Sequence, residues 1–225
     1  MKYQKKWKTM MNNDITVEII GEILKDKDLS KDDKKEKLDI IFPNAQKYIA
    51  EILNMIDFDG NREGLIDTPY RVVKSWLELY KGYSEKPKEI LETTFTDNME
   101  KVDEIVICKD ITFSSMCEHH MLPFHGVCHI GYLPDKKVVG LSKLARLVEC
   151  FSKRLQIQEH LTNQIADSLI KYLAPQGVGV VINAKHLCMS HRGVRNPTSN
   201  MITSSMRGKF KDQIQTRNEF LSLIK

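Results

Sequence analysis

Two β-strands are predicted within residues 105–133, IVICKDITFSSMCEHHMLPFHGVCHIGYL. β-Branched and aromatic residues dominate 105–115 and 127–133, and such residues favour the pleated, half-buried surface of a sheet. The segment between them contains one thiol and two imidazoles within four positions, at Cys117, His119 and His120. The two predicted strands therefore flank a group of potential metal ligands.

The chain beyond this segment continues with two helices and two further strands. Residues 140–153 and 157–173 have helical spacing, and Ser142 is a plausible N-cap of the first helix. Residues 178–189 and 199–210 are predicted strands, and 212–224 is a closing helix. This order favours an α+β fold, in which helices cover one face of an antiparallel sheet of four strands.

The first hundred residues are different in character. Residues 1–37 are rich in lysine and aspartate, which predicts a charged tail with one apolar, helical stretch at 17–24. Apolar residues then recur at helical spacing to residue 56, and Thr68-Pro69 is typical of the start of a second helix. We predict a tail over 1–37, a helical region over 38–100 and the domain that carries the chemistry over 101–225.

Composition excludes several classes of protein. Hydrophobic residues make up 41% of the 225 positions, the net charge is +4, and the five cysteines are too few for a disulfide scaffold. No stretch approaches the roughly 20 apolar residues of a membrane span, and the basic N-terminus lacks the apolar core of a secretory signal. We expect a cytoplasmic protein with reduced thiols, and neither a nucleic acid nor a membrane as partner.

A metal site is the strongest chemical prediction. Cys117 and His120 stand three apart, and in His186-Leu187-Cys188 the strand alternation would place both outer side chains on one face. Thiolate and imidazole are the donors that zinc prefers. Three interpretations stay open at this point: an open site of Cys117, His120 and Cys188, a closed clip that adds His186, and a disulfide between the two cysteines. His119, beside a ligand, is a candidate acid/base group.

The other cysteines and histidines are better explained by burial or exposure than by chemistry. They are Cys108, Cys128, Cys150, His125, His129, His160 and His191.

Basic residues form pairs in three regions, and such pairs can bind phosphate. They are Arg71 with Lys74, Lys143 with Arg146, and Arg192 with Arg195. Spacing alone does not bring these pairs to one pocket.

Several motifs in one order resemble the GTP cyclohydrolase I family. The likeness runs from about Asp67 to the C-terminus and rests on SMCEHH at 115–120, GLSKLAR at 140–146, Gln158-Glu159, and HLCM at 186–189 followed by RGV at 192–194. His160 departs from it, because the family commonly has arginine after the glutamate. The tail to about residue 37 matches no family segment.

The resemblance implies a tunnelling fold of ββααββ order and a role for each motif residue. Zinc would be bound by Cys117, His120 and Cys188, with His119 and His186 as the catalytic acid/base groups. Glu159, helped by Gln158, would accept hydrogen bonds from the guanine edge. The triphosphate and ribose would be held by Arg71, Lys74, Ser142, Lys143, Arg146 and Arg192.

The reaction that the resemblance implies is zinc-dependent hydrolysis of GTP at C8, with release of formate and rearrangement to 7,8-dihydroneopterin triphosphate. This is the first step of folate or tetrahydrobiopterin synthesis. The family assembles as a homodecamer with active sites between subunits. Two rival functions are a fold relative that binds a pterin or purine with another outcome, and a zinc-clipped interaction subunit without catalysis.

Overall fold

In a computed structural model of the chain, residues 30, 32, 36, 42, 44–96 and 103–225 are described. They belong to two compact units, Met1–Ser84 and Glu85–Lys225. The predicted tail and its helical stretch at 17–24 lie outside the described residues, and so do the predicted domain boundaries near residues 37 and 100.

The first unit contains a pair of helices. These are α4 (Ala45–Ile56) and α5 (Thr68–Leu79), followed by a 3₁₀ turn, η1 (Lys81–Tyr83). Tyr70 and Val73 of α5 are buried against apolar side chains that include Ile49 of α4. Thr68 is the first residue of α5, and Asp67 holds the N-cap position without a side-chain capping hydrogen bond.

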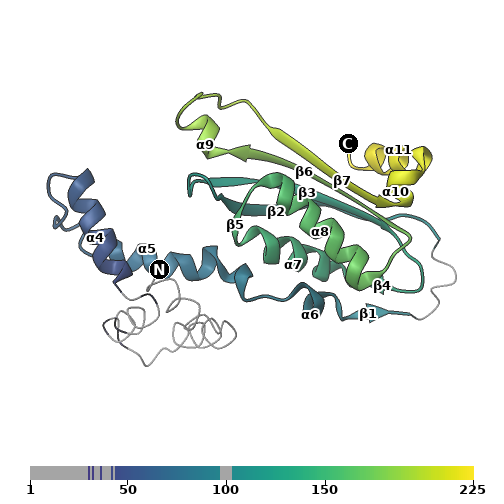
Figure 1. The fold of residues 1–225 in the computed structure, drawn as a ribbon, viewed down its shortest axis with the longest axis horizontal. Helices are drawn as coiled ribbons and strands as arrows, with labels where there is room; N and C mark the ends of the chain where they lie inside the picture. Colours follow the sequence, from purple (N-terminus) through teal and green to yellow (C-terminus); the bar gives the residue numbers. More distant parts are fainter. Residues whose placement is uncertain (1–29, 31, 33–35, 37–41, 43, 97–102) are drawn as a thin grey trace, which may run out of the picture. The chain divides into compact units, whose positions relative to one another are not determined.

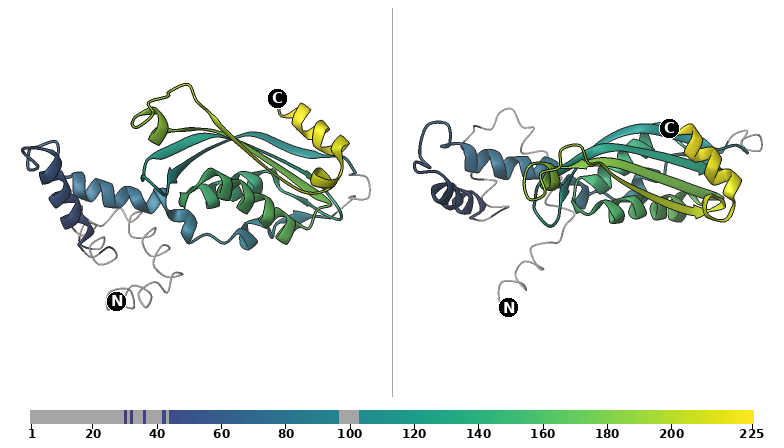
Figure 2. Two further views of the ribbon diagram at one scale, coloured as in Figure 1. Left: turned by 45° about the horizontal axis from the view of Figure 1, so that its top comes forward. Right: turned by 90° about the horizontal axis from the view of Figure 1, so that it is seen from above.

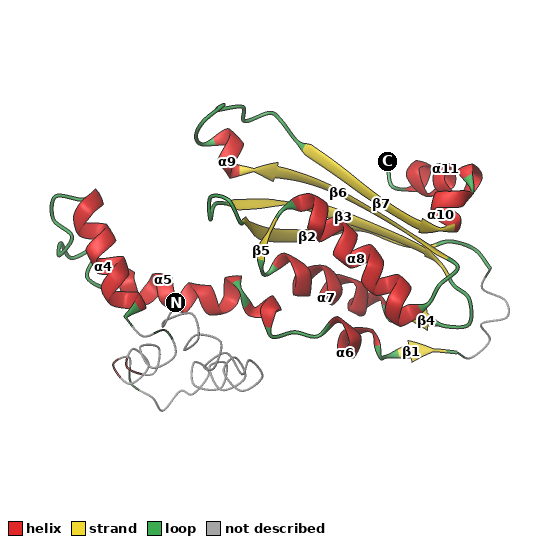
Figure 3. Cartoon of the chain, viewed as in Figure 1, coloured by secondary structure: helices red, strands yellow, loops and turns green. Residues whose placement is uncertain are grey.

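The second unit is a curved sheet with helices on both faces (Figures 1 and 3). Its elements are α6 (Pro87–Leu91), β1 (Thr94–Phe95), β2 (Val106–Cys117), β3 (Pro123–Leu133), β4 (Val138–Val139), α7 (Leu141–Ser152), β5 (Leu155–Gln156), α8 (Gln158–Leu173), β6 (Gly177–His186), α9 (Leu187–Ser190), β7 (Met201–Gly208), α10 (Lys209–Asp212) and α11 (Ile214–Leu223).

A mixed α+β class is confirmed, but the sheet differs from the predicted one. Its order is β5-β2-β3-β6-β7, and the four long strands pair antiparallel as expected. The fifth strand, β5, pairs parallel with the end of β2. Because β5 has only two residues, no periodic pattern in the sequence predicts it. A separate pair, β1 and β4, was also not predicted.

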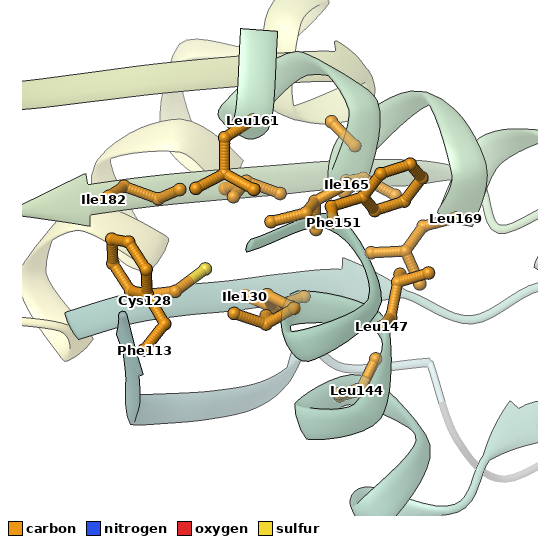
Figure 4. Packing of buried hydrophobic residues seen from close by; sticks show 14 of the residues in the cluster. Phe113, Cys128, Ile130, Leu144, Leu147, Phe151, Leu161, Ile165, Leu169 and Ile182 are labelled. Carbon is orange, nitrogen blue, oxygen red and sulfur yellow. The ribbon is translucent and has the colours of Figure 1, made fainter. Parts of the chain in front are cut away.

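The main core lies between the sheet and α7 with α8. Alternate residues of β6, such as Val180 and Ile182, point to this side and pack with Leu147 and Ile165 of the helices. Figure 4 shows Leu147, Ile165 and Ile182 among the side chains that meet between the strands and the two helices. Gly140, rather than Ser142, caps α7, which leaves Ser142 exposed on the first turn.

The prediction that helices cover one face alone is wrong. Phe210 of α10 and Phe220 of α11 are buried on the opposite face, with Val181 of β6 (Figure 2). Two strand glycines allow this close approach, since an added Cβ at Gly131 or Gly179 would come within 2.6 Å and 2.8 Å of the Phe220 ring. The C-terminal helices therefore belong to the core of this unit.

A β-bulge in β2 is held by a buried histidine. The pairing with β3 shifts between Cys108 and Ile111, and Asp110 has a positive φ of 59°. Its backbone N–H donates to Nδ1 of His129, 3.1 Å away. Burial lowers the pKa of His129, the carboxylate of Asp110 opposes this, and the charge of Lys109 adds to it.

We expect His129 to make the fold less stable in weak acid. Below the ordinary histidine pKa of 6.5, His129 of the unfolded chain takes up a proton that the folded protein resists. The free energy of unfolding therefore decreases as the pH decreases. Above that pH both states are neutral and the effect vanishes. Urea midpoints of the native protein and of His129→Gln at about pH 7.5 and 5.5 test this. The glutamine keeps an acceptor for the backbone N–H of Asp110 but cannot take up a proton, so the urea midpoint of the variant should fall less between the two pH values. Equal falls in the two proteins would contradict it.

Candidate metal centre and catalytic site

The first two candidate ligands lie in a tight connection between β2 and β3. Cys117 is the last residue of β2, and its backbone N–H donates to the carbonyl of Leu122 across the turn. Met121 closes the turn with a positive φ of 51° and donates to the carbonyl of Cys117. The Glu118 N–H is bound by Gln156 of β5. This folding back brings Nδ1 of His120 to 3.6 Å from Sγ of Cys117.

The third ligand comes from a helical turn. We expected residues 178–189 to be one strand, but β6 ends at His186 and Leu187–Ser190 form α9. The pairing of β6 with β3 ends at His186 and Phe124, next to Pro123, where β3 begins. Beyond that point the chain has no strand partner on this side and turns instead. Cys188 therefore reaches the metal group from α9 and not through strand alternation.

The side chains of Cys117, His120 and Cys188 can hold a metal ion. Their ligand atoms lie within 4.8 Å of one another, and within the described ranges no other cluster of three such residues does so. Burial raises the pKa of the Cys188 thiol, and the neighbouring Cys117 raises it further. Two thiolates this close repel each other, so a divalent cation between them offsets both penalties. Two sulfurs and one imidazole suit zinc.

His186 is turned toward a different partner. Its Nε2 lies 2.8 Å from Oε1 of Gln158, at the start of α8. Its ring stacks on that of Phe124, with centroids 4.5 Å apart and an angle of 2° between the planes. Burial lowers the pKa of His186, while the negative charge of Glu159 raises it. His186 is thus next to the metal group in sequence but is not a member of it.

His119 is an exposed neighbour of His120, the candidate metal ligand. Its side chain is 63% exposed, and Nε2 lies 3.8 Å from a carboxylate oxygen of Glu118. The rings of His119 and His120 meet edge to face with centroids 6.1 Å apart. Consecutive residues at a turn point in different directions, so His119 can act on a bound molecule while His120 takes the metal.

The candidate phosphate-binding residues are only partly brought together. Ser142 and Arg146 share the exposed face of α7, one turn apart, with Lys143 beside them. The charge of Arg192 acts on the thiol of Cys188, which places this arginine near the metal group. In the part of the chain that the structure describes, no hydrogen bond or ion pair joins the α7 residues to that group.

The remaining basic candidates belong to the first unit. Arg71 pairs with Asp67 at 3.7 Å, and Nζ of Lys74 lies over the ring of Tyr70 at 5.8 Å. Both are exposed on α5.

Comparison with known proteins assigns the chain to a family. The model of the family described as GTP cyclohydrolase I matches residues 45–225, which include the whole second unit, part of the first, and every candidate site residue. The chain belongs to the GTP cyclohydrolase I family. The match begins before Asp67, so the likeness includes α4 as well.

Curated relatives are similar over most of their length. The GTP cyclohydrolase 1 of Wolinella succinogenes is 56% identical over 80% of this chain and 95% of its own. Those of Bacillus subtilis and Coxiella burnetii are 50% and 51% identical, over 80% and 79% of this chain and 94% and 96% of theirs. A solved archaeosine synthase QueF-Like in the apo form is remote, with 14% identity and a TM-score of 0.39 over 46% of this chain and 93% of its own.

Two features of this GTP cyclohydrolase I family site were not predicted from the sequence. Phe124 carries the ring on which His186 stacks, and its position opposite His186 depends on strand register. Gln158 is 1% exposed, and its amide is hydrogen-bonded within the protein. Its side chain therefore does not face a ligand pocket, whereas the exposed side chain of Glu159 can. Neither feature has a signal in residue spacing. Among the described helices, none is long and apolar enough to cross a membrane.

Proposed function

We propose that this protein catalyses the hydrolysis of GTP at C8, with release of formate and rearrangement to 7,8-dihydroneopterin triphosphate. The observation that carries the proposal is the group of Cys117, His120 and Cys188 with two histidines, His119 and His186, outside it. Three protein ligands leave a coordination position open, which is characteristic of catalytic zinc sites. A closed clip would add His186, but neither ring nitrogen of His186 lies among the ligand atoms of this group.

The three ligands would hold zinc in this proposal. When bound in such a site, zinc supplies activated water at neutral pH, because it lowers the pKa of the bound water to about 7. Opening of the guanine imidazole ring at C8 also needs a proton at N7, and either His119 or His186 would donate it. The second hydrolysis frees C8 as formate. The ribose then rearranges and condenses with the exposed pyrimidine amine.

Substrate recognition falls to the exposed charged residues. The carboxylate of Glu159 suits the N1–H and 2-amino donors of guanine. The triphosphate and ribose would be bound by Ser142, Lys143 and Arg146 on α7 and by Arg192 after α9, together with Arg71 and Lys74.

We also propose the ββααββ tunnelling fold, the three-part division of the chain near residues 37 and 100, and a homodecamer whose neighbouring chains contribute some of these contacts. Native mass spectrometry tests the assembly.

One assay separates the proposed function from its rivals. Purified protein is incubated with GTP, and bound zinc, released formate and the fluorescence of oxidised neopterin are measured together. The proposal requires zinc and equal amounts of formate and pterin. Bound zinc without formate would favour an interaction subunit. A bound purine or pterin without formate would favour a fold relative with another reaction.

Glu159→Gln is expected to lower kcat/KM for GTP by about 10²-fold, since one charged acceptor for two guanine donors is lost. ITP lacks the 2-amino group, so the preference for GTP over ITP should shrink in the variant. Steady-state kinetics with both nucleotides measure this. Asp167→Asn is a matched control, because Asp167 is another carboxylate of α8 and pairs with Arg207 at 2.8 Å. A similar loss in both variants would contradict the assignment.

A further inference from the structure

The side chain of Gln158 is fixed in one orientation by acceptors inside the protein. Its Nε2 lies 3.1 Å from the carbonyl oxygen of Ile182 on β6 and 2.9 Å from that of Met201 on β7. A third oxygen, Oγ1 of Thr203, lies 3.1 Å away. Carbonyl oxygens cannot donate hydrogen bonds, so the amide group that faces them must be the NH₂. A flipped side chain would oppose three oxygens with a fourth.

The surrounding hydroxyl groups support this orientation. Oγ1 of Thr162 donates to the backbone carbonyl of Gln158 at 2.7 Å and lies 2.6 Å from Oγ1 of Thr203. Thr203 therefore donates toward Thr162 and accepts from Gln158. The two hydrogens of the Gln158 amide are shared among three acceptors, and the network connects α8, β6 and β7. Gln158 is 1% exposed, so water does not compete for these contacts.

The fixed amide determines which nitrogen of His186 carries the hydrogen. With its NH₂ directed into the protein, Gln158 presents Oε1 to His186, and Oε1 can only accept. Nε2 of His186, 2.8 Å away, must therefore be the protonated nitrogen. In the neutral ring this leaves Nδ1 with a free lone pair. Within the described residues, no hydrogen bond reaches Nδ1 of His186.

We propose that Gln158 is a positioning residue for catalysis, which holds His186 in the tautomer with hydrogen on Nε2 so that Nδ1 exchanges protons with the substrate. Gln158 fixes the tautomer and the direction of the ring, while the stack on Phe124 fixes its plane. Oε1 keeps its hydrogen bond whether Nδ1 is protonated or not, so the same contact serves both halves of a proton transfer. Gln158 itself does not touch guanine. This inference rests on the proposed function, in which His186 is an acid/base group.

The main test is Gln158→Met, with Gln156→Met as the matched control. Gln156 is an equally buried glutamine two residues away, and its amide binds Phe151 and Gln164 rather than His186. Thermal unfolding of each metal-loaded variant is measured alongside its kinetics, so that the cost of a lost buried amide is known. We expect Gln158→Met to lower kcat by about 10²-fold with KM for GTP within about twofold. Gln156→Met should stay within about threefold in kcat.

A conservative variant and a spectrum complete the test. Gln158→Glu keeps an acceptor toward His186 but loses the NH₂ that faces Ile182 and Met201, so its thermal unfolding is measured too. Its folded fraction should retain more kcat than that of Gln158→Met. In solid-state NMR spectra of protein with ¹⁵N-labelled histidine, taken at pH 8, the His186 signals are identified by their loss in His186→Asn. We expect the pattern of hydrogen on Nε2 in the native protein and in Gln156→Met, and a mixture of tautomers in Gln158→Met.

Three results would overturn the proposal. The first is a rise in KM with kcat unchanged, which would make Gln158 a guanine contact. The second is an equal loss of kcat in the two methionine variants, and the third is hydrogen on Nδ1 of His186 in the native protein. Failure of the proposed function would look different. The native protein would then release no formate from GTP, while the NMR spectrum would still report the tautomer.

Discussion

Replacing Cys188 with alanine is expected to remove bound zinc and to lower formate release from GTP by at least about 10³-fold, equivalent to about 4 kcal/mol of transition-state stabilisation. The physical reason is that two ligands do not hold the ion against dilution, and the reaction loses its activated water. Zinc content by mass spectrometry and formate release are measured on the same sample.

Cys108→Ala is the control for this experiment. Cys108 is a partly buried thiol of β2 that does not belong to the metal group. It should keep zinc and activity. Full formate release together with undiminished zinc in Cys188→Ala would refute the assignment of this cysteine.

His119→Ala is expected to lower kcat by about 10²- to 10⁴-fold while zinc stays bound, because general acid/base catalysis contributes about that much. The exposed His119 side chain makes little packing contact, so the fold should tolerate its removal. Its neighbour is the matched comparison, since His120→Ala should lose zinc as well as activity. The pair separates proton transfer from metal binding at adjacent positions. Loss of zinc from His119→Ala, or its retention in His120→Ala, would reverse the two roles.

The order of the main elements follows from local sequence signals. The strands around 105–115 and 127–133 and the helices over 140–173 are long and periodic, and the structure contains them with shifts of a few residues. The two residues of β5 carry no such pattern. The face that α11 covers is decided by Gly131 and Gly179, whose missing side chains admit Phe220. That fit depends on two strands far from the helix in sequence.

The three predicted ligands lie together in the structure, but one of them comes from a different element than predicted. Cys117 and His120 are local in sequence, and their turn brings them together. Cys188 was expected to lie on a strand, because the residues before it continue the apolar pattern of β6. Strand β6 ends beside Pro123, where its pairing with β3 stops, and Cys188 lies on the helical turn α9 that follows. The orientation of Gln158 depends on carbonyl groups of β6 and β7, which no motif encodes.

The group of Cys117, His120 and Cys188 has a consequence for how this protein folds and persists in the cell. It joins the turn after β2 to the turn after β6, about seventy residues later in the chain. An ion held there acts as a reversible cross-link that the unfolded chain lacks, so free zinc favours the folded state by mass action. The concentration of free metal then determines part of the stability of the folded state. With zinc as the proposed ion, a chain made under zinc scarcity would be deficient in stability as well as in catalysis.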